Sequence, residues 1–165
     1  MAAYNLIATT TVGAAGSANI TFSSIPQTFT DLLLVVSGRC TGSGSGIDIT
    51  FNGNTSNYSN RTLQGNGSAA SSYGTYNRNS GFVNFSTETA SVFGSSSIYI
   101  PNYSGSANKS YSSDGVAENN ATTAYGGLIA GLWSDTAAIT SIALSPMSGT
   151  FVQHSSASLY GIKSS

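Results

Sequence analysis

The sequence predicts an all-β protein, an antiparallel β-sandwich of jelly-roll type formed by one domain over residues 1–165. Apolar and polar residues alternate with a period of two in several short segments, and turn-forming residues separate these segments. No segment of helical length carries the 3.6-residue apolar period of an amphipathic helix. About eight strands in two sheets would form a jelly roll.

Clean alternation marks three strands in the first third of the chain. Each pattern places one face in a core and the other in water, as in an antiparallel sheet. The apolar positions are Tyr4, Leu6 and Ala8 in the first strand, Ala18, Ile20 and Phe22 in the second, and Ile47, Ile49 and Phe51 in the third.

Other segments are apolar at consecutive positions, so both of their faces need cover. They span residues 32–36, 98–100 and 128–133. A second sheet can cover one face, and a loop or a neighbouring subunit must then cover the other. The last third of the chain adds apolar runs at residues 139–144 and 158–162, which complete the expected set of strands.

Turn-forming residues predict the connections between these strands. The run Thr41–Gly46, TGSGSG, is typical of a flexible hairpin loop. Residues 52–84 are poorer in apolar side chains, and we expect long loops there with one or two irregular strands. Residues 102–124 have the same character, and a glycine-rich strand follows from Tyr125.

The composition is unusual because hydroxyl and amide side chains replace charges. Ser (31), Thr (18), Asn (14) and Gly (19) fill 82 of 165 positions, whereas charged residues make up 7%. An ordinary soluble domain has about a quarter of its residues charged. Such a surface favours a packed assembly over an enzyme cleft.

Charge and hydropathy argue against nucleic-acid and membrane partners. The net charge is −1, and the five Lys and Arg residues are scattered, so no basic stripe could neutralise a phosphate backbone. The longest apolar run, residues 32–36, is far shorter than the roughly 20 residues that span a bilayer. The first residues also lack a basic segment followed by a long apolar core, so we expect no signal peptide.

Residue chemistry predicts no enzyme, cofactor or metal site. One His and one Cys cannot complete a tetrahedral metal site. His154 has no Gly-x-Ser-x-Gly nucleophile elbow to serve, and nothing singles out two of the six carboxylates for glycoside hydrolysis. We interpret Cys40 as a small apolar filler at the end of a strand.

The candidate functional residues are therefore contact residues. The segments that are apolar on both faces predict a contact between subunits, and Tyr supplies rigid area with a hydroxyl for protein or sugar contacts. The tyrosines could equally close the ends of the sandwich core. The candidates are Leu32, Leu34, Val36, Leu128, Trp133, Tyr58, Tyr73, Tyr76, Tyr103 and Tyr111.

Both ends of the chain resemble small virion structural proteins of tailed bacteriophages. The similar segments are residues 4–11 (YNLIATTT), 22–39 (FSSIPQTFTDLLLVVSGR), 131–142 (GLWSDTAAITSI) and 157–163 (ASLYGIK). The resemblance implies a non-enzymatic protein of the virion, assembled in the host cytoplasm. It does not distinguish a place on the head from a place on the tail.

Within this resemblance, we expect a capsid decoration or cement protein. Such a protein binds the major capsid protein and itself, as a homo-oligomer of three-fold symmetry, and stabilises the joints between capsomers. The alternative is a tail-associated module that binds a receptor or a host-surface glycan through its Tyr-rich and Asn-rich loops.

Overall fold

The computed structural model describes residues 3–44, 46–75, 77–118 and 124–163, which form β-strands and no helix. The twelve strands are β1 (Ala3–Thr11), β2 (Ile20–Phe22), β3 (Asp31–Gly38), β4 (Gly46–Phe51), β5 (Tyr58–Gly65), β6 (Ala70–Thr75), β7 (Asn79–Phe82), β8 (Gly94–Ile100), β9 (Lys109–Glu118), β10 (Ala124–Trp133), β11 (Ile142–Pro146) and β12 (Ser156–Lys163).

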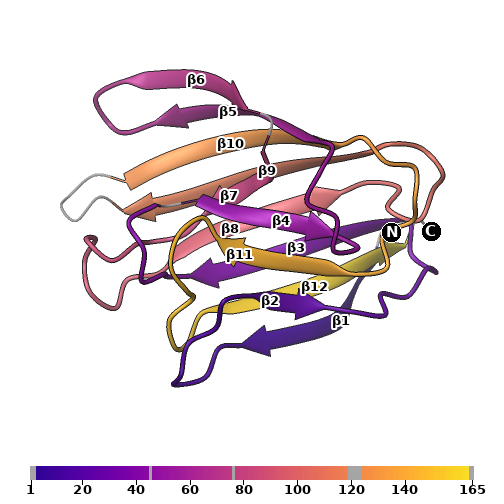
Figure 1. The fold of residues 1–165 in the computed structure, drawn as a ribbon, viewed down its shortest axis with the longest axis horizontal. Coiled ribbons are helices and arrows are strands. Elements are labelled where there is room, and N and C mark those ends of the chain that lie inside the picture. Colours follow the sequence, from indigo (N-terminus) through magenta and orange to yellow (C-terminus); the bar gives the residue numbers. More distant parts are fainter. Residues whose placement is uncertain (1–2, 45, 76, 119–123, 164–165) are drawn as a thin grey trace.

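The strands form two antiparallel sheets that pack face to face (Figure 1). The larger sheet has the order β1-β12-β3-β8-β9-β10-β5-β6, and the smaller has the order β2-β11-β4-β7. All-β sandwich architecture is thus confirmed.

Eight of the strands have the connectivity of a jelly roll. The half-sheet β1-β12-β3-β8 faces the sheet β2-β11-β4-β7, and the chain passes repeatedly from one to the other. The hairpin β5–β6 is inserted between β4 and β7, and the hairpin β9–β10 between β8 and β11. Both hairpins join the larger sheet, which becomes twice as wide as the smaller one.

The core lies between the sheets. It contains a cluster of aromatic rings where the inserted hairpins pack against the smaller sheet. Trp133 of β10 is 1% exposed, with its ring centroid 5.5 Å from that of Phe51 in β4. Tyr58 of β5 stacks on Trp133, at a centroid distance of 6.1 Å, and the rings of Tyr111 and Phe51 form a T-shaped pair. These contacts join the inserted hairpins to the jelly-roll core.

The structure corrects the contact residues expected in β3 and the face assigned to β1. Leu32, Leu34 and Val36 of β3 point into the core, so they cannot form a subunit contact. Tyr4 and Leu6 of β1, predicted to face the core, are 63% and 59% exposed. A β-bulge between Leu6 and Ala8 shifts the register by one residue, so Tyr4 and Leu6 face outward, whereas Ala8, which is paired with the buried Leu159, faces the core.

Two predicted connections are also wrong. Residues 41–46 do not close a hairpin, because β3 and β4 belong to different sheets. Residues 52–84 contain three strands, β5, β6 and β7, where one or two were expected. Residues 102–124, expected to have the same character, include the ten-residue strand β9. The glycine-rich strand predicted from Tyr125 is confirmed as β10.

Candidate functional site: the outer face of the eight-stranded sheet

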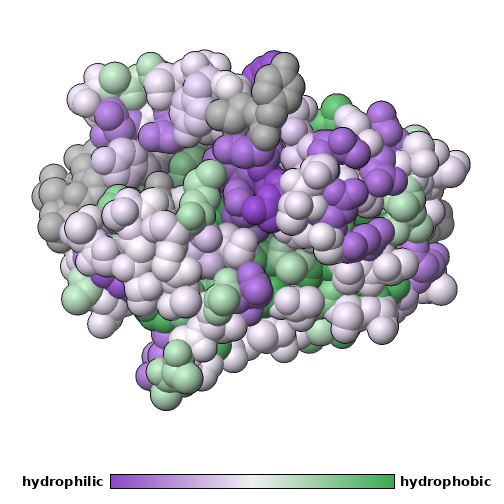
Figure 2. Space-filling model, in the orientation of Figure 1, coloured by the Kyte–Doolittle hydropathy of each residue, from purple (hydrophilic) through white to green (hydrophobic). Residues whose placement is uncertain are grey.

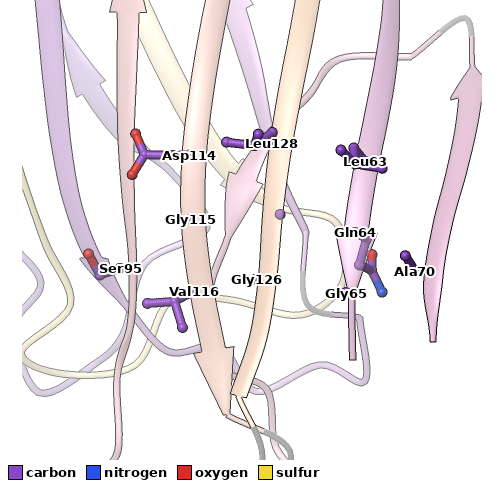
Figure 3. Close-up of a pocket in the computed structure, with 11 residues that line it drawn as sticks. Leu63, Gln64, Gly65, Ala70, Ser95, Asp114, Gly115, Val116, Gly126 and Leu128 are labelled. Carbon is purple, nitrogen blue, oxygen red and sulfur yellow. The ribbon is translucent and has the colours of Figure 1, made fainter. Parts of the chain in front are cut away.

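We define the outer face as the side chains of the eight-stranded sheet that point away from the four-stranded sheet. The strand register aligns these side chains in rows across the sheet. One row is Ser97, Asp114, Leu128, Leu63 and Ser72, from β8 to β6. The next is Ser95, Val116, Gly126, Gly65 and Ala70. Figure 3 shows residues of both rows together.

The outer face holds eight of the eleven exposed large hydrophobic residues in the described part of the chain. They form two groups, one at each side of the sheet. The β10 patch consists of Leu63, Val116, Leu128 and Leu132. The β1 patch consists of Tyr4, Leu6, Val35 and Tyr99. Contiguous exposed apolar surface of this kind marks an interaction site.

Small side chains make the β10 patch uneven. A hollow of 550 Å³ lies beside Leu63, Val116 and Leu128, and a second of 410 Å³ adjoins it on the other side of Leu63 and Leu128. Gly65 and Gly126 form part of the floor of the first hollow, and the space that a Cβ would occupy at each glycine is open. The hollows arise where side chains are missing, and they suit a protruding side chain of another protein.

Charges on this face are few. The described strands contribute Asp31, Arg61 and Asp114 to it. Asp31 accepts hydrogen bonds from the Tyr99 hydroxyl (2.8 Å) and the Asn102 amide (2.9 Å). Arg61 and Asp114 are exposed on β5 and β9. Depletion of charge is typical of the buried centre of a protein interface.

The side of the molecule that carries the four-stranded sheet has a mixed surface. Figure 2, in the orientation of Figure 1, shows that it is mostly pale, with purple residues gathered near its upper middle and green hydrophobic areas in its lower half. The two apolar patches defined above belong to the outer face of the eight-stranded sheet.

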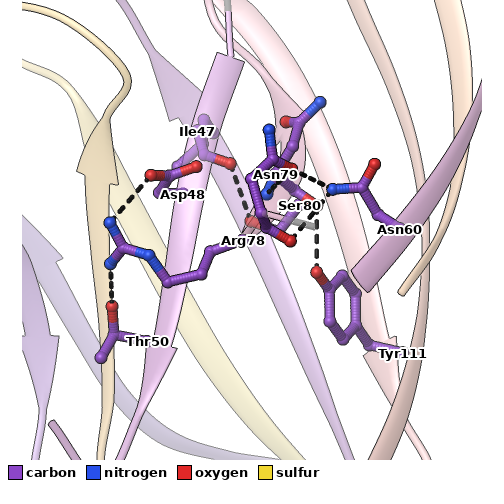
Figure 4. A network of polar contacts seen from close by, with 9 residues as sticks. Ile47, Asp48, Thr50, Asn60, Arg78, Asn79, Ser80 and Tyr111 are labelled. Carbon is purple, nitrogen blue, oxygen red and sulfur yellow. Dashed lines mark hydrogen bonds and ion pairs between the residues drawn. The ribbon is translucent and has the colours of Figure 1, made fainter. Parts of the chain in front are cut away.

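Polar residues around β4 and β7 form a structural network, shown in Figure 4, which lies partly on the outward side of the smaller sheet and partly between the two sheets. Arg78 donates to Asp48 Oδ2 (3.0 Å) and to Thr50 Oγ1 (2.6 Å) in β4. The Tyr111 hydroxyl donates to the Asn79 carbonyl at 3.0 Å, which ties β9 to β7. Burial raises the pKa of the Asp48 carboxyl, although the Arg78 guanidinium opposes the shift. The network anchors the hairpins on the smaller sheet.

The candidate tyrosines divide between core and surface. Tyr58, Tyr103 and Tyr111 are buried, which makes them core residues. Burial raises the pKa of Tyr58 to about 12, so its hydroxyl stays neutral and accepts the Phe51 amide at 2.7 Å. Tyr73 is 43% exposed on β6 and donates to Gln64 Oε1 at 3.0 Å. Tyr76 lies outside the described residues.

Of the five apolar candidates, Leu128 alone reaches the outer face, because Trp133 is buried with the three residues of β3. The candidates Leu32, Leu34 and Val36 in β3 and Trp133 in β10 occupy inward positions. Val35 and Leu132 are the exposed members of those runs, and Leu63 and Val116 lie in stretches expected to be loops. Both strands contain few apolar residues and these are not spaced by two, so the sequence of β5 and β9 gives no period-two signal.

The described ranges hold no group of three or more His, Cys, Asp or Glu that could bind a metal ion. Cys40 is buried, and burial raises the pKa of its thiol. No helix in this part of the chain could cross a membrane.

Comparisons with known proteins give no relative. The chain matches no family model, and no curated protein or solved structure matches it significantly.

Proposed function

We propose that this chain is a non-enzymatic structural protein of a tailed-phage virion, a decoration protein that binds the major capsid protein on the outside of the shell. The observation that carries the proposal is the outer face of the eight-stranded sheet, which is wide, poor in charge and rich in exposed hydrophobic side chains. Such a face supports binding to another protein. The resemblance of both chain ends to virion proteins supports the phage particle as the setting.

The β1 patch is the part of this face that we assign to the shell. It brings Tyr4 and Leu6 from β1 together with Val35 and Tyr99 from β3 and β8. Aromatic residues are enriched at interface centres because they bury large area with little loss of side-chain freedom. Area buried against two neighbouring capsomers would stabilise their joint.

The test is to add purified protein to matching phage heads that lack it and to whole tailed particles, and to image both by cryo-electron microscopy. We expect regular density over the shell. Density confined to the tail would overturn the decoration role in favour of receptor or glycan binding.

A matched pair of variants tests the assigned surface. Val35→Lys places a charge in the β1 patch, whereas Val92→Lys places one in the β7–β8 connection at similar exposure, 37% against 43%. We expect Val35→Lys to remove the shell density and Val92→Lys to retain it. Shell binding by Val35→Lys at the wild-type level would contradict the assignment. Both side chains are exposed, and thermal unfolding verifies that both variants fold.

A further inference from the structure

We infer that the β10 patch binds the same patch of a second copy of this chain, around a two-fold axis that lies along β10 in the contact plane. β10 lies between β5 and β9 in the sheet, so these two strands are placed symmetrically about it. Arg61, on β5, is an exposed cation, and Asp114, on β9, is an exposed anion. The inference concerns the free protein and does not depend on a role in the virion.

A two-fold contact is self-complementary: where one residue meets another, the reciprocal contact also forms. Rotation about an axis along β10 places β5 of one copy over β9 of the other. Arg61 then lies over the second copy's Ser112, two residues along β9 from Asp114, and the same arrangement repeats on the other side of the axis. Arg61 is opposite Ala130 and Asp114 is opposite Leu128, so they are offset by two residues, about 7 Å along the strand. The long Arg side chain can cover that offset.

The apolar side chains of the patch also fit a copy of themselves. Leu63 and Leu128 are 51% and 56% exposed, and they stand beside the hollow above Gly65 and Gly126. The patch therefore offers both a protrusion and a hollow on one surface. Rotation about β10 places Val116 of each copy over Gly65 of the other, because both residues are paired with Gly126, so the Val116 side chain can enter the open space above Gly65.

The face is large enough for a stable contact. Five neighbouring strands at ~4.8 Å spacing and ~27 Å length give a projected area of roughly 650 Å². A standard protein interface buries about 800 Å² of accessible surface on each partner. A second copy accounts for equal and opposite charges on either side of β10, which a foreign partner would not require.

Charge reversal tests the pairing, with the dimer dissociation constant measured by analytical ultracentrifugation. We expect the wild type to dimerise and the single variants Arg61→Asp and Asp114→Arg each to weaken dimerisation at least tenfold. The double variant exchanges the two charges and should return to within about threefold of the wild type. Lys163→Glu, a reversal at the exposed end of β12, should leave dimerisation unchanged.

A wild type that stays monomeric up to millimolar concentration, or that forms only trimers, would overturn the inference. So would single variants that dimerise normally. Particle binding is measured separately, so a monomer that decorates phage heads would refute this inference and leave the proposed function standing, whereas a dimer without particle binding would do the reverse.

Crosslinking tests the position of the axis. A residue close to a two-fold axis meets its own copy, so Ala130→Cys on β10 should crosslink to itself with a short bismaleimide. Ser37→Cys is exposed on the same face but three strands away, so its copies would be ~29 Å apart. Equal crosslinking of both variants, or none at Ala130→Cys, would contradict an axis along β10. The native Cys40 thiol is buried, so the wild type, which lacks the added cysteine, serves as the control and should form no crosslink.

Discussion

Buried charged side chains in this protein hold loops in place. The Lys109 ammonium donates to the carbonyls of Gly105 (2.7 Å), Ala107 and Thr136 (3.4 Å). It thereby joins the β8–β9 connection to the β10–β11 connection. Burial lowers the pKa of Lys109, and the Asp135 carboxylate opposes this shift. Carbonyl groups that would otherwise be buried without a donor explain why a lysine can be 1% exposed here.

Glu88 is the residue at which pH should change stability. It is 5% exposed in the β7–β8 connection, and its Oε2 accepts the Phe85 amide at 2.9 Å. Its Oε1 is buried with no hydrogen-bond partner among the described residues. Burial raises the pKa of Glu88, and the nearby Glu118 carboxylate adds to the shift, while the Phe85 amide and the Arg39 guanidinium oppose it.

A raised folded-state pKa means that the folded protein binds this proton more tightly than the unfolded chain. The resulting stabilisation is complete below the unfolded-state pKa, about 4.3, and is lost as the pH rises through the folded-state pKa. Glu88→Gln should therefore gain stability relative to the wild type between pH 4 and pH 7. Urea unfolding across this range measures the difference, and the two proteins should converge near pH 3.5. A variant that becomes relatively less stable toward neutral pH would refute the assignment.

At the scale of elements, the glycines of β10 alternate in role with the two faces of the strand. An added Cβ at Gly131 would overlap the ring of Tyr111, and one at Gly127 would overlap the ring of Phe82. A Cβ added at either glycine would be directed into the sandwich, where an aromatic side chain already occupies the space. Gly126 points outward, and a Cβ there would meet nothing within 4 Å.

This difference predicts opposite effects of one substitution at two positions in the same strand. Gly131→Ala should destabilise the protein by about 1–3 kcal/mol, because the Tyr111 ring must move within a packed core. Gly126→Ala should be neutral or stabilise by about 0.4–1 kcal/mol, because it only restricts the unfolded chain. Urea denaturation gives both values. Equal destabilisation by both substitutions would mean that strand propensity, and not the aromatic ring, sets the cost.

Period-two alternation predicted β2 and β4 because each has apolar residues at every second position. It missed β9, since Lys109 and Ser113 occupy inward positions there and their polar groups hide the pattern. Period-two alternation also could not predict which side chains of β3 face the core, because the apolar residues there are consecutive. That face is set by the register with β8 and β12, which depends on residues remote in sequence.

At the scale of the whole molecule, the candidate site comes from widening one sheet of a jelly roll. The inserted hairpins add β9, β10, β5 and β6 to the larger sheet. The outer face is assembled from all eight of its strands, so its composition could not be deduced before their order was known. The charge-poor composition predicted a protein-binding surface in general, while the structure locates the apolar patches on one side of the sandwich.

The nature of this surface predicts how the inferred dimer should respond to salt. Apolar contacts supply most of the affinity, and the two Arg61–Asp114 pairs chiefly set the orientation. Exposed ion pairs contribute ~0.5 kcal/mol each, so screening both would cost about 1 kcal/mol, roughly a fivefold change in dissociation constant. Between 50 and 500 mM NaCl we therefore expect the dissociation constant to rise less than about tenfold by analytical ultracentrifugation. A rise of a hundredfold would mean that charges hold the copies together, and the β10 patch would then not be the main source of binding energy.

A small rise in the wild type, combined with a large loss in the charge-reversed single variants, would separate the two contributions, because reversal adds repulsion whereas salt only removes attraction.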